Sequence, residues 1–183
     1  MDVNFTRHLL VDGANLLHAW PELRAMLPHQ RPAARALLAR RVGVIHDVEE
    51  MRVTLVFDGR GPELALERPS DEPTFSVLHT PSALTADDVI EQLVGSPNSE
   101  PARCIVATGD RAERQTVETL GARAISPEEL AAWVERASAR QGSRVSAWRR
   151  AQQGGAPDAG SPPQPPTDGS KGASAAPDGP DGR

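Results

Sequence analysis

The chain of 183 residues lacks several features on which whole classes of protein depend. It contains one cysteine, Cys104, which excludes an internal disulfide framework and any CxxC zinc site. No apolar stretch approaches the ~18 residues of a membrane span, and the N-terminus lacks the long apolar core of a signal peptide. We therefore expect a cytoplasmic protein with no membrane partner and no redox chemistry, in which Cys104 is a small core residue.

Common catalytic and cofactor motifs are also missing. The glycines form neither G-x-G-x-x-G nor G-x-x-x-x-G-K-[ST], so we expect no nucleotide cofactor. There is no G-x-S-x-G turn and no H-E-x-x-H helix, which removes acyl transfer and zinc proteolysis. The histidines show no spacing typical of metal ligands, so a histidine metal site is not expected either.

The net charge of -5 conceals a division of the chain into three segments. Residues 1–135 hold 13 Arg against 21 acidic residues, whereas 136–150 hold five Arg and no acid. Residues 151–183 contain 7 Gly and 7 Pro with alanine as the only apolar side chain, a composition that predicts disorder. We expect a domain over 1–135 and a disordered tail. The basic segment between them is either the frayed end of the last helix or an arm that orders on a partner.

Within the domain, short apolar runs alternate with helical patterns. The runs predict strands over 8–12, 53–58, 75–79, 104–108 and 123–125. The helical patterns cover 16–26, 31–50, 85–94, 111–120 and a last segment from 126 to about 140. This alternation predicts an α/β fold, with a central parallel sheet of about five strands covered by helices on both faces.

Acidic residues gather where these strands end. Asp12 and Asp58 end the first two runs, Asp110 lies just past the fourth, and Asp87-Asp88 begins the helix after the third. Ligands bind outside the carboxyl ends of parallel strands, so these acids share one rim of the sheet. Several close carboxylates need a cation, and oxygen ligands favour Mg²⁺ or Mn²⁺. Such a metal ion activates water for phosphate-ester cleavage.

The helix that begins near residue 85 offers two acids for this rim. Thr85 and Asp88 match a capping box, so Asp88 is better explained as a helix-start residue than as a ligand. Asp87 is the preferred ligand. Glu91 lies four residues further and shares a face with Asp87, an arrangement of like charges that a cation or a bound water would relieve.

Two other rim residues allow two interpretations each. Asp58 stands in Asp-Gly, a common turn pair, and is either a turn residue or a ligand. Asn15 either caps the first helix or places a carboxamide near the metal and phosphate, and the first role does not exclude the second.

An ordered series of motifs supports a resemblance. Leu10-Val-Asp-Gly-Ala-Asn15 is followed by Val56-Phe-Asp58, Thr85-Ala-Asp87 and Ala107-Thr-Gly-Asp-Arg-Ala-Glu113. Over roughly 8–135 the chain resembles the YacP-like NYN domain family, which belongs to the PIN-like nucleases. The resemblance implies a compact α/β fold whose acidic divalent-metal site cuts RNA endonucleolytically. One branch of the family is associated with ribosomes and cleaves messages during translation.

The resemblance also assigns roles by motif. It implies catalytic roles for Asp12, Asn15, Asp87 and Asp110, metal ligation by Asp12, Asp58, Asp87 and Asp110, and supporting roles for Thr85, Asp88, Glu91 and Thr108. Three positions depart from the family pattern: Ala14 replaces a frequent Tyr, Gly109 a frequent Ser, and Asp88 a small polar residue. None of these departures removes a carboxylate.

An acidic body needs cations to hold RNA. The residues expected to contact RNA are Arg60, Arg111 and Arg114 near the strand ends, and Arg136, Arg140 and Arg144 in the basic segment. Trp20 and Trp148 are candidates to stack on an unpaired base, although Trp20 beside a proline is more often a packing residue.

The leading hypothesis is an endoribonuclease that uses Mg²⁺ or Mn²⁺. The main alternative is a non-catalytic RNA- or ribosome-binding module of the same fold that uses the 136–150 segment. A phosphatase of small phosphoesters is a third interpretation, weakened because the first strand end offers one aspartate where that chemistry usually has two. No apolar stripe demands a dimer, and the oligomeric state stays open.

Overall fold

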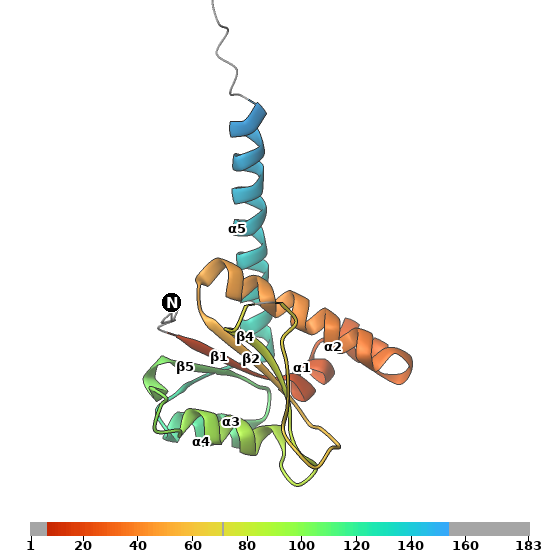
Figure 1. The fold of residues 1–183 in the computed structure, drawn as a ribbon, viewed down its shortest axis with the longest axis vertical. Coiled ribbons are helices and arrows are strands. Elements are labelled where there is room, and N and C mark those ends of the chain that lie inside the picture. The colour runs from red at the N-terminus through yellow and green to blue at the C-terminus, as the bar shows by residue number, and fades with distance from the viewer. Residues whose placement is uncertain (1–6, 71, 154–183) are drawn as a thin grey trace, which may run out of the picture.

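The computed structural model describes residues 7–70 and 72–153, which form a six-stranded sheet between two layers of helices (Figure 1). The strand order is β3-β4-β2-β1-β5-β6; β3 is antiparallel to β4, and the other strands run parallel. The strands are β1 (His8–Asp12), β2 (Arg52–Phe57), β3 (Ala65–Glu67), β4 (Phe75–His79), β5 (Cys104–Ala107) and β6 (Arg123–Ile125). The predicted α/β class and the predicted parallel sheet are confirmed.

Helices cover both faces of the sheet, as predicted. They are α1 (Gly13–Ala19), α2 (Pro21–Glu49), α3 (Ala86–Val94), α4 (Arg111–Thr119) and α5 (Pro127–Gln153), with a short 3₁₀ turn at Pro101–Arg103. Side chains alternate along a strand, so Leu9 and Val11 of β1 join the core under α1, α2 and α5, while Leu10 joins the core under α3 and α4.

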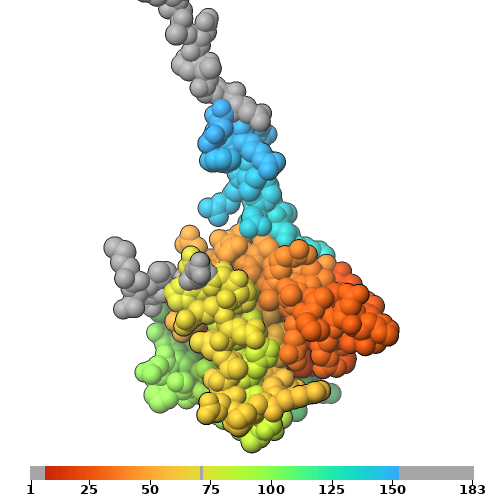
Figure 2. All heavy atoms as spheres, turned by 45° about the vertical axis from the view of Figure 1, so that its right-hand side comes forward, coloured from red at the N-terminus to blue at the C-terminus, as the bar shows by residue number. Residues whose placement is uncertain are grey.

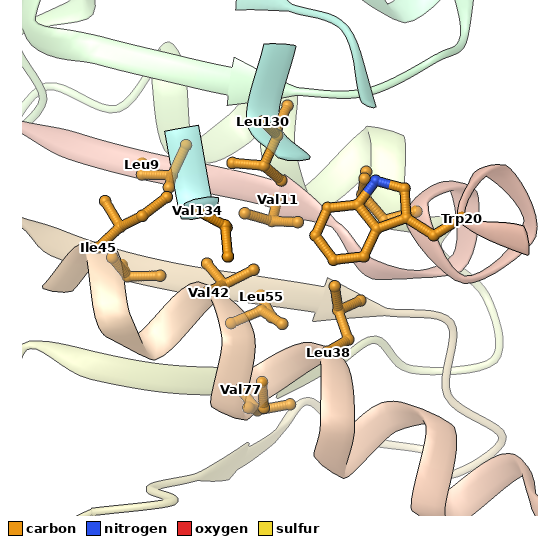
Figure 3. Close-up of a cluster of buried hydrophobic side chains, with 14 of the residues drawn as sticks. Leu9, Val11, Trp20, Leu38, Val42, Ile45, Leu55, Val77, Leu130 and Val134 are labelled. Carbon is orange, nitrogen blue, oxygen red and sulfur yellow. The ribbon is translucent and has the colours of Figure 1, made fainter. Parts of the chain in front are cut away.

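The larger core holds the N-terminal helices against α5. Trp20 lies among Leu38, Val42 and Leu130 above the sheet (Figure 3). It is 6% exposed, and its indole N–H donates to the carbonyl of Pro127 at 3.1 Å. Burying a large apolar side chain contributes about 1.5–3 kcal/mol to folding. Trp20 is therefore a packing residue and cannot stack on a base.

The first helices differ from the prediction of 16–26 and 31–50. The break falls at Trp20, whose backbone is extended (φ -83°, ψ 117°), because a residue that precedes proline avoids the helical region. Pro28 and Pro32 lie inside α2, where the backbone at Gln30 leaves helical geometry (φ -138°, ψ 43°) and two helical segments meet at a kink. The predicted break between residues 26 and 31 corresponds to this kink, whereas the break at Trp20 was not predicted.

Two further elements exceed the prediction. β3 is a sixth strand at the sheet edge, and its three residues are all exposed, so no burial pattern marks it in the sequence. α5 continues beyond residue 140 to Gln153, so the basic segment 136–150 is helical. The disordered tail was predicted from residue 151, but 151–153 belong to α5, and the rest of it falls outside the described residues. Cys104 is buried as predicted. Within the described ranges no helix is long and apolar enough to cross a membrane.

Candidate metal centre

The carboxyl edge of the sheet collects the acids that the sequence places at strand ends. Asp12 ends β1 and caps α1, because its Oδ1 accepts the Asn15 backbone N–H at 3.0 Å. The side chain is 5% exposed. Burial raises the pKa of Asp12 to about 6, and the carboxylates of Asp87 and Asp58 add to the rise. The first aspartate therefore lies buried within reach of two other acids.

The start of α3 brings in Asp87. The predicted capping box is confirmed: Thr85 Oγ1 accepts from the Asp88 backbone at 3.2 Å, and Asp88 Oδ2 accepts from the Thr85 backbone at 2.9 Å. Asp88 is thus engaged by the helix end, whereas Asp87 is half-buried beside the sheet edge. Burial raises the pKa of Asp87, and Asp110, Asp58 and the nearby Glu91 raise it further.

The start of α4 contributes an acid that the sequence analysis missed, Glu113. Asp110 caps this helix, with its Oδ1 accepting from the backbones of Ala112 at 2.7 Å and Glu113 at 3.1 Å. A glutamate at this position usually returns to the N–H of the capping residue. Here the Asp110 N–H donates to Thr108 Oγ1 at 3.0 Å instead, so the Glu113 carboxylate is left to point into the protein.

Glu113 is 2% exposed, and neither of its carboxylate oxygens has a partner in hydrogen-bonding geometry. Burial raises the pKa of Glu113 to about 8; the neighbouring Thr108 side chain lowers it in part, and the charges of Asp12, Asp87 and Asp110 raise it. A buried polar group without a partner is costly, and native structures rarely keep one without a reason.

Three acids meet at one point. One carboxylate oxygen each from Asp12, Asp87 and Glu113 lies within 4.8 Å of the others. An all-oxygen donor set with net negative charge suits a hard divalent cation such as Mg²⁺ or Mn²⁺. The unpartnered oxygens of Glu113 fit such an ion, because coordination would satisfy both its charge and its lone pairs.

Asp58 and Asn15 connect the elements around this cluster. Asp58 is exposed at the end of β2, and its Oδ1 accepts the Ala86 N–H at the start of α3 at 2.8 Å. Asn15 Oδ1 accepts the Gly109 N–H at 2.7 Å, which joins α1 to the loop between β5 and α4. A Cβ at Gly109 would lie 2.7 Å from that same oxygen, so a serine there would displace the Asn15 carboxamide. Neither Asp58 nor Asp110 belongs to the three-acid group.

Three of the arginines expected to bind RNA flank the acidic edge. Arg60 lines a depression of about 650 Å³ that also includes Asp58. Arg114 lines another of about 450 Å³ beside Asn15. Arg111 is exposed in the first turn of α4.

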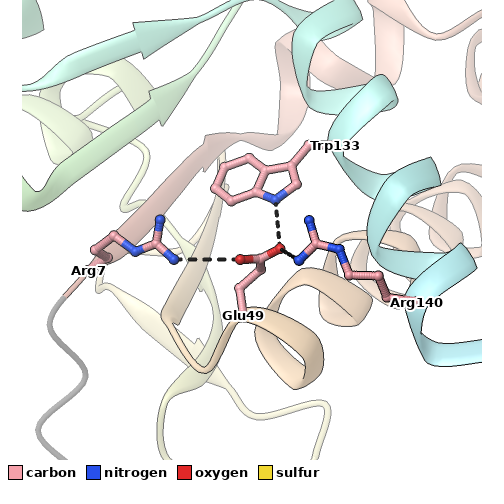
Figure 4. A network of polar contacts seen from close by, with 4 residues as sticks. All are labelled: Arg7, Glu49, Trp133 and Arg140. Carbon is pink, nitrogen blue, oxygen red and sulfur yellow. Dashed lines mark hydrogen bonds and ion pairs between the residues drawn. The ribbon is translucent and has the colours of Figure 1, made fainter. Parts of the chain in front are cut away.

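The arginines of α5 lie elsewhere. Arg140 Nη1 donates to Glu49 Oε1 at 2.7 Å, and Arg7 Nη2 lies 3.6 Å from the other oxygen of Glu49 (Figure 4). Arg7 precedes β1 and Glu49 precedes β2, so this network marks the amino edge of the sheet. At ~3.3 Å per residue, a five-residue strand separates the two edges by ~15 Å. The predicted RNA contacts on α5, which are Arg136, Arg140 and Arg144, therefore start at the opposite edge of the sheet from the acids.

Comparisons with known proteins agree with this architecture. The sequence model of the YacP-like NYN domain family matches residues 9–158. A protein of Bacillus subtilis (strain 168), described as uncharacterized protein YacP, is 32% identical over 137 residues, or 75% of this chain and 80% of that protein. The crystal structure of Rae1 (YacP) from Bacillus subtilis is similar at 30% identity and a TM-score of 0.66, covering 80% of this chain and 84% of that one. A crystal structure of a mutant of that protein gives 29% identity and a TM-score of 0.65, with 79% and 84% covered.

Proposed function

This chain belongs to the YacP-like NYN domain family, whose fold is of the nuclease type, and we propose that it is a divalent-metal-dependent endoribonuclease that hydrolyses phosphodiester bonds in RNA. The observation that carries the proposal is the cluster of Asp12, Asp87 and Glu113. Three carboxyl groups in one partly buried site destabilise the protein unless a cation balances them, so their presence together calls for a functional explanation.

We assign these three residues as the ligands of Mg²⁺ or Mn²⁺. Asp58 and Asp110 each use one carboxylate oxygen to hold the start of a helix, so we assign them to positioning Asp87 and Glu113. When bound, the ion would lower the pKa of a water molecule and neutralise charge on the phosphoryl group. Asn15 accepts the Gly109 N–H and thereby fixes the loop that carries Asp110. This bond keeps the start of α1 and the start of α4 at a constant separation.

The raised pKa values of Asp12 and Glu113 have a consequence for this assignment. Without the ion, Glu113 keeps its proton at neutral pH, and metal binding must displace it. Metal affinity and cleavage should therefore increase between pH 6 and pH 8. Family resemblance adds the ribosome as a partner, and we extend the proposal to messenger RNA bound there.

The alternative is a binding module without catalysis, which the exposed arginines of α5 favour. Such a module has no use for a buried glutamate with two unpartnered oxygens. For this reason the catalytic interpretation is preferred.

The test compares cleavage of purified RNA and of messages in a translating extract, with and without Mn²⁺. Asp87→Asn and Glu113→Gln should each reduce cleavage by more than the ~10–100-fold typical of residues outside the ligand set. Glu118→Gln is the matched control, because Glu118 is exposed near the far end of the same helix as Glu113. Circular dichroism should show that all three variants remain folded.

Each outcome decides between the two interpretations. Cleavage of purified RNA by wild type but not by Asp87→Asn supports a free-standing nuclease, and cleavage in the extract alone supports action on the ribosome. Undiminished Mn²⁺-dependent cleavage by both acid variants would overturn the ligand assignment. Failure of the wild type on both substrates would favour the binding module.

A further inference from the structure

A groove runs along α2 and reaches the acidic edge. Its near part is the depression of about 650 Å³ beside Asp58 and Ala14, and its far part is a hollow of about 810 Å³ between α2 and the strands β3 and β4. The two parts share the lining residues Arg31, Arg35, Phe57, Glu67 and His79, so they are continuous. In the space-filling view, α2 (orange) lies beside residues 60–70 and 72–80 (yellow) (Figure 2).

The groove is lined by cations that lack ionic partners. Among the described residues, none of its arginines forms an ion pair; they are Arg31, Arg35, Arg40, Arg60 and Arg68. Its three carboxylates have partners other than these five arginines: Asp58 accepts the Ala86 N–H, Glu67 lies 3.3 Å from His79 of the same groove, and Asp47 lies 2.9 Å from His46. The groove therefore presents a net positive surface directly beside a negative site.

Arg35 is held in place at the junction of the two parts. Its guanidinium lies 4.8 Å from the centre of the Phe57 ring, a cation–π contact that orients the side chain. Its Nε is buried and donates no hydrogen bond. Burial and the adjacent charge of Arg31 lower the pKa of Arg35, the carboxylates of Glu67 and Asp58 offset this in part, and Arg60 adds to the repulsion. An anion between these side chains would relieve the repulsion and occupy the free donors.

Phosphate is the anion that fits a set of fixed guanidinium groups beside a phosphodiester-cleaving site. The far part of the groove also exposes apolar atoms of Pro32, Ala36 and Val44, which suit unpaired bases better than phosphates. A paired RNA helix shows its phosphates on a broad outer surface, whereas single-stranded RNA can splay its bases into a narrow groove.

We propose that this groove binds the single-stranded segment of RNA next to the cleaved bond, with Arg31, Arg35 and Arg60 contacting its phosphates. The substrate class rests on the endoribonuclease function proposed above. The groove positions the strand so that one phosphodiester reaches the acidic cluster, and the arginines offset the repulsion between the strand and the acidic body.

Binding is tested separately from cleavage. Fluorescence anisotropy with a short labelled single-stranded RNA, in chelator, measures the Kd of the full chain. Arg31→Ala and Arg60→Ala are the main variants because both side chains are exposed and need not affect folding. Each substitution should raise Kd by about tenfold, the size expected for one charged contact. Each should also reduce the steepness with which the logarithm of the association constant falls with the logarithm of the salt concentration, by about 0.7.

Two further variants test the proposal more specifically. Arg35→Lys keeps the charge but loses the planar fork, so it should raise Kd with little change in the salt slope. Arg24→Ala is the matched control, since Arg24 is exposed on α2 and does not line the groove. A Kd increase for Arg24→Ala equal to that for the groove variants would mean general attraction and would overturn the proposal. Equal competition by duplex RNA would overturn its single-stranded part.

The Mn²⁺ cleavage assay separates failure of this proposal from failure of the function. If cleavage depends on Asp87 while Arg31→Ala and Arg60→Ala leave Kd and KM unchanged, the groove assignment is wrong and the nuclease stands. If binding depends on these arginines but no protein cleaves RNA, the groove assignment stands and the nuclease is wrong.

Discussion

The carboxyl group of Glu113 sets the pH response of the folded protein. It is buried beside two other acids, and burial raises its pKa from 4.5 to about 8. The unfolded chain therefore releases this proton at lower pH than the folded protein does. A group of this kind contributes fully to stability below its unfolded pKa, and the contribution is lost as the pH rises through the folded value. The metal-free protein should become less stable between pH 4.5 and pH 8.

Replacing Glu113 by glutamine should remove this loss, because glutamine stays neutral. In chelator, the Tm values of Glu113→Gln and wild type should be close near pH 4.5. At pH 8 the variant should melt several degrees higher, because each kcal/mol of unfolding free energy shifts the Tm by roughly 2–4 °C in a chain of this size. Saturating Mn²⁺ should raise the Tm of wild type more than that of the variant. The measurement is a series of thermal melts, with Glu118→Gln as control. A difference that does not grow with pH would contradict the burial of an ionisable Glu113.

The sequence predicted where two of the three clustered acids lie, because their location follows from their position in the chain. Asp12 and Asp87 are at the acidic edge because the carboxyl ends of parallel strands, and the helices that follow them, meet there. Glu113 could not be distinguished from a capping residue, because Asp110-x-x-Glu113 is itself a common helix start. Only the hydrogen bond from the Asp110 N–H to Thr108 shows that Glu113 is free for another role, and that bond depends on the tertiary structure.

Asp58 acts between elements, since it connects the end of β2 to the start of α3. Asp58→Asn keeps a carbonyl oxygen that can accept the Ala86 N–H, whereas Asp58→Ala loses it. If Asp58 positions α3, the asparagine variant should retain most of its cleavage. The alanine variant should lose about 1 kcal/mol of stability, together with activity. Chemical denaturation and Mn²⁺ titration of cleavage measure the two effects. A loss of Mn²⁺ affinity in both variants would instead make Asp58 a metal ligand.

Elements that bury one or both faces were predictable, and elements that do not were missed. β1, β2, β4, β5 and β6 read as apolar runs because the sheet is covered on both sides. β3 is exposed along its length and forms because it pairs with β4, so its sequence shows no hydrophobic pattern that predicts a strand. The far half of α5 is likewise exposed, and its helical state follows from propensity and from continuity with a buried first half.

At the scale of the whole molecule, the acidic cluster and the arginines of α5 lie far apart. α5 starts at Pro127, whose side chain lies near Gly109, and runs past the amino edge of the sheet (Figure 1). At ~1.5 Å per residue, its 27 residues extend ~40 Å, so Arg149 lies ~33 Å along the axis from Pro127. The far part of the groove along α2 reaches Gln141 of α5, and Arg149 lies eight residues, or ~12 Å, further along the helix, so a short RNA held beside the acidic edge does not reach the end of α5.

This separation predicts that α5 contributes to affinity only for long or structured RNA. Arg149 and Arg150 lie beyond Gln141, where the groove meets α5, and replacing both by glutamine should leave the fold and the cleavage of short RNA unchanged. Binding to long RNA or to ribosomes should weaken, with the salt slope reduced by roughly 0.7–0.9 per arginine. Anisotropy and ribosome sedimentation over a salt series measure the change. The charge-matched control replaces the exposed Arg24 and Arg52 by glutamine. If the α5 variant instead slowed short and long substrates equally, short RNA would also contact the end of α5, and the predicted separation would be wrong.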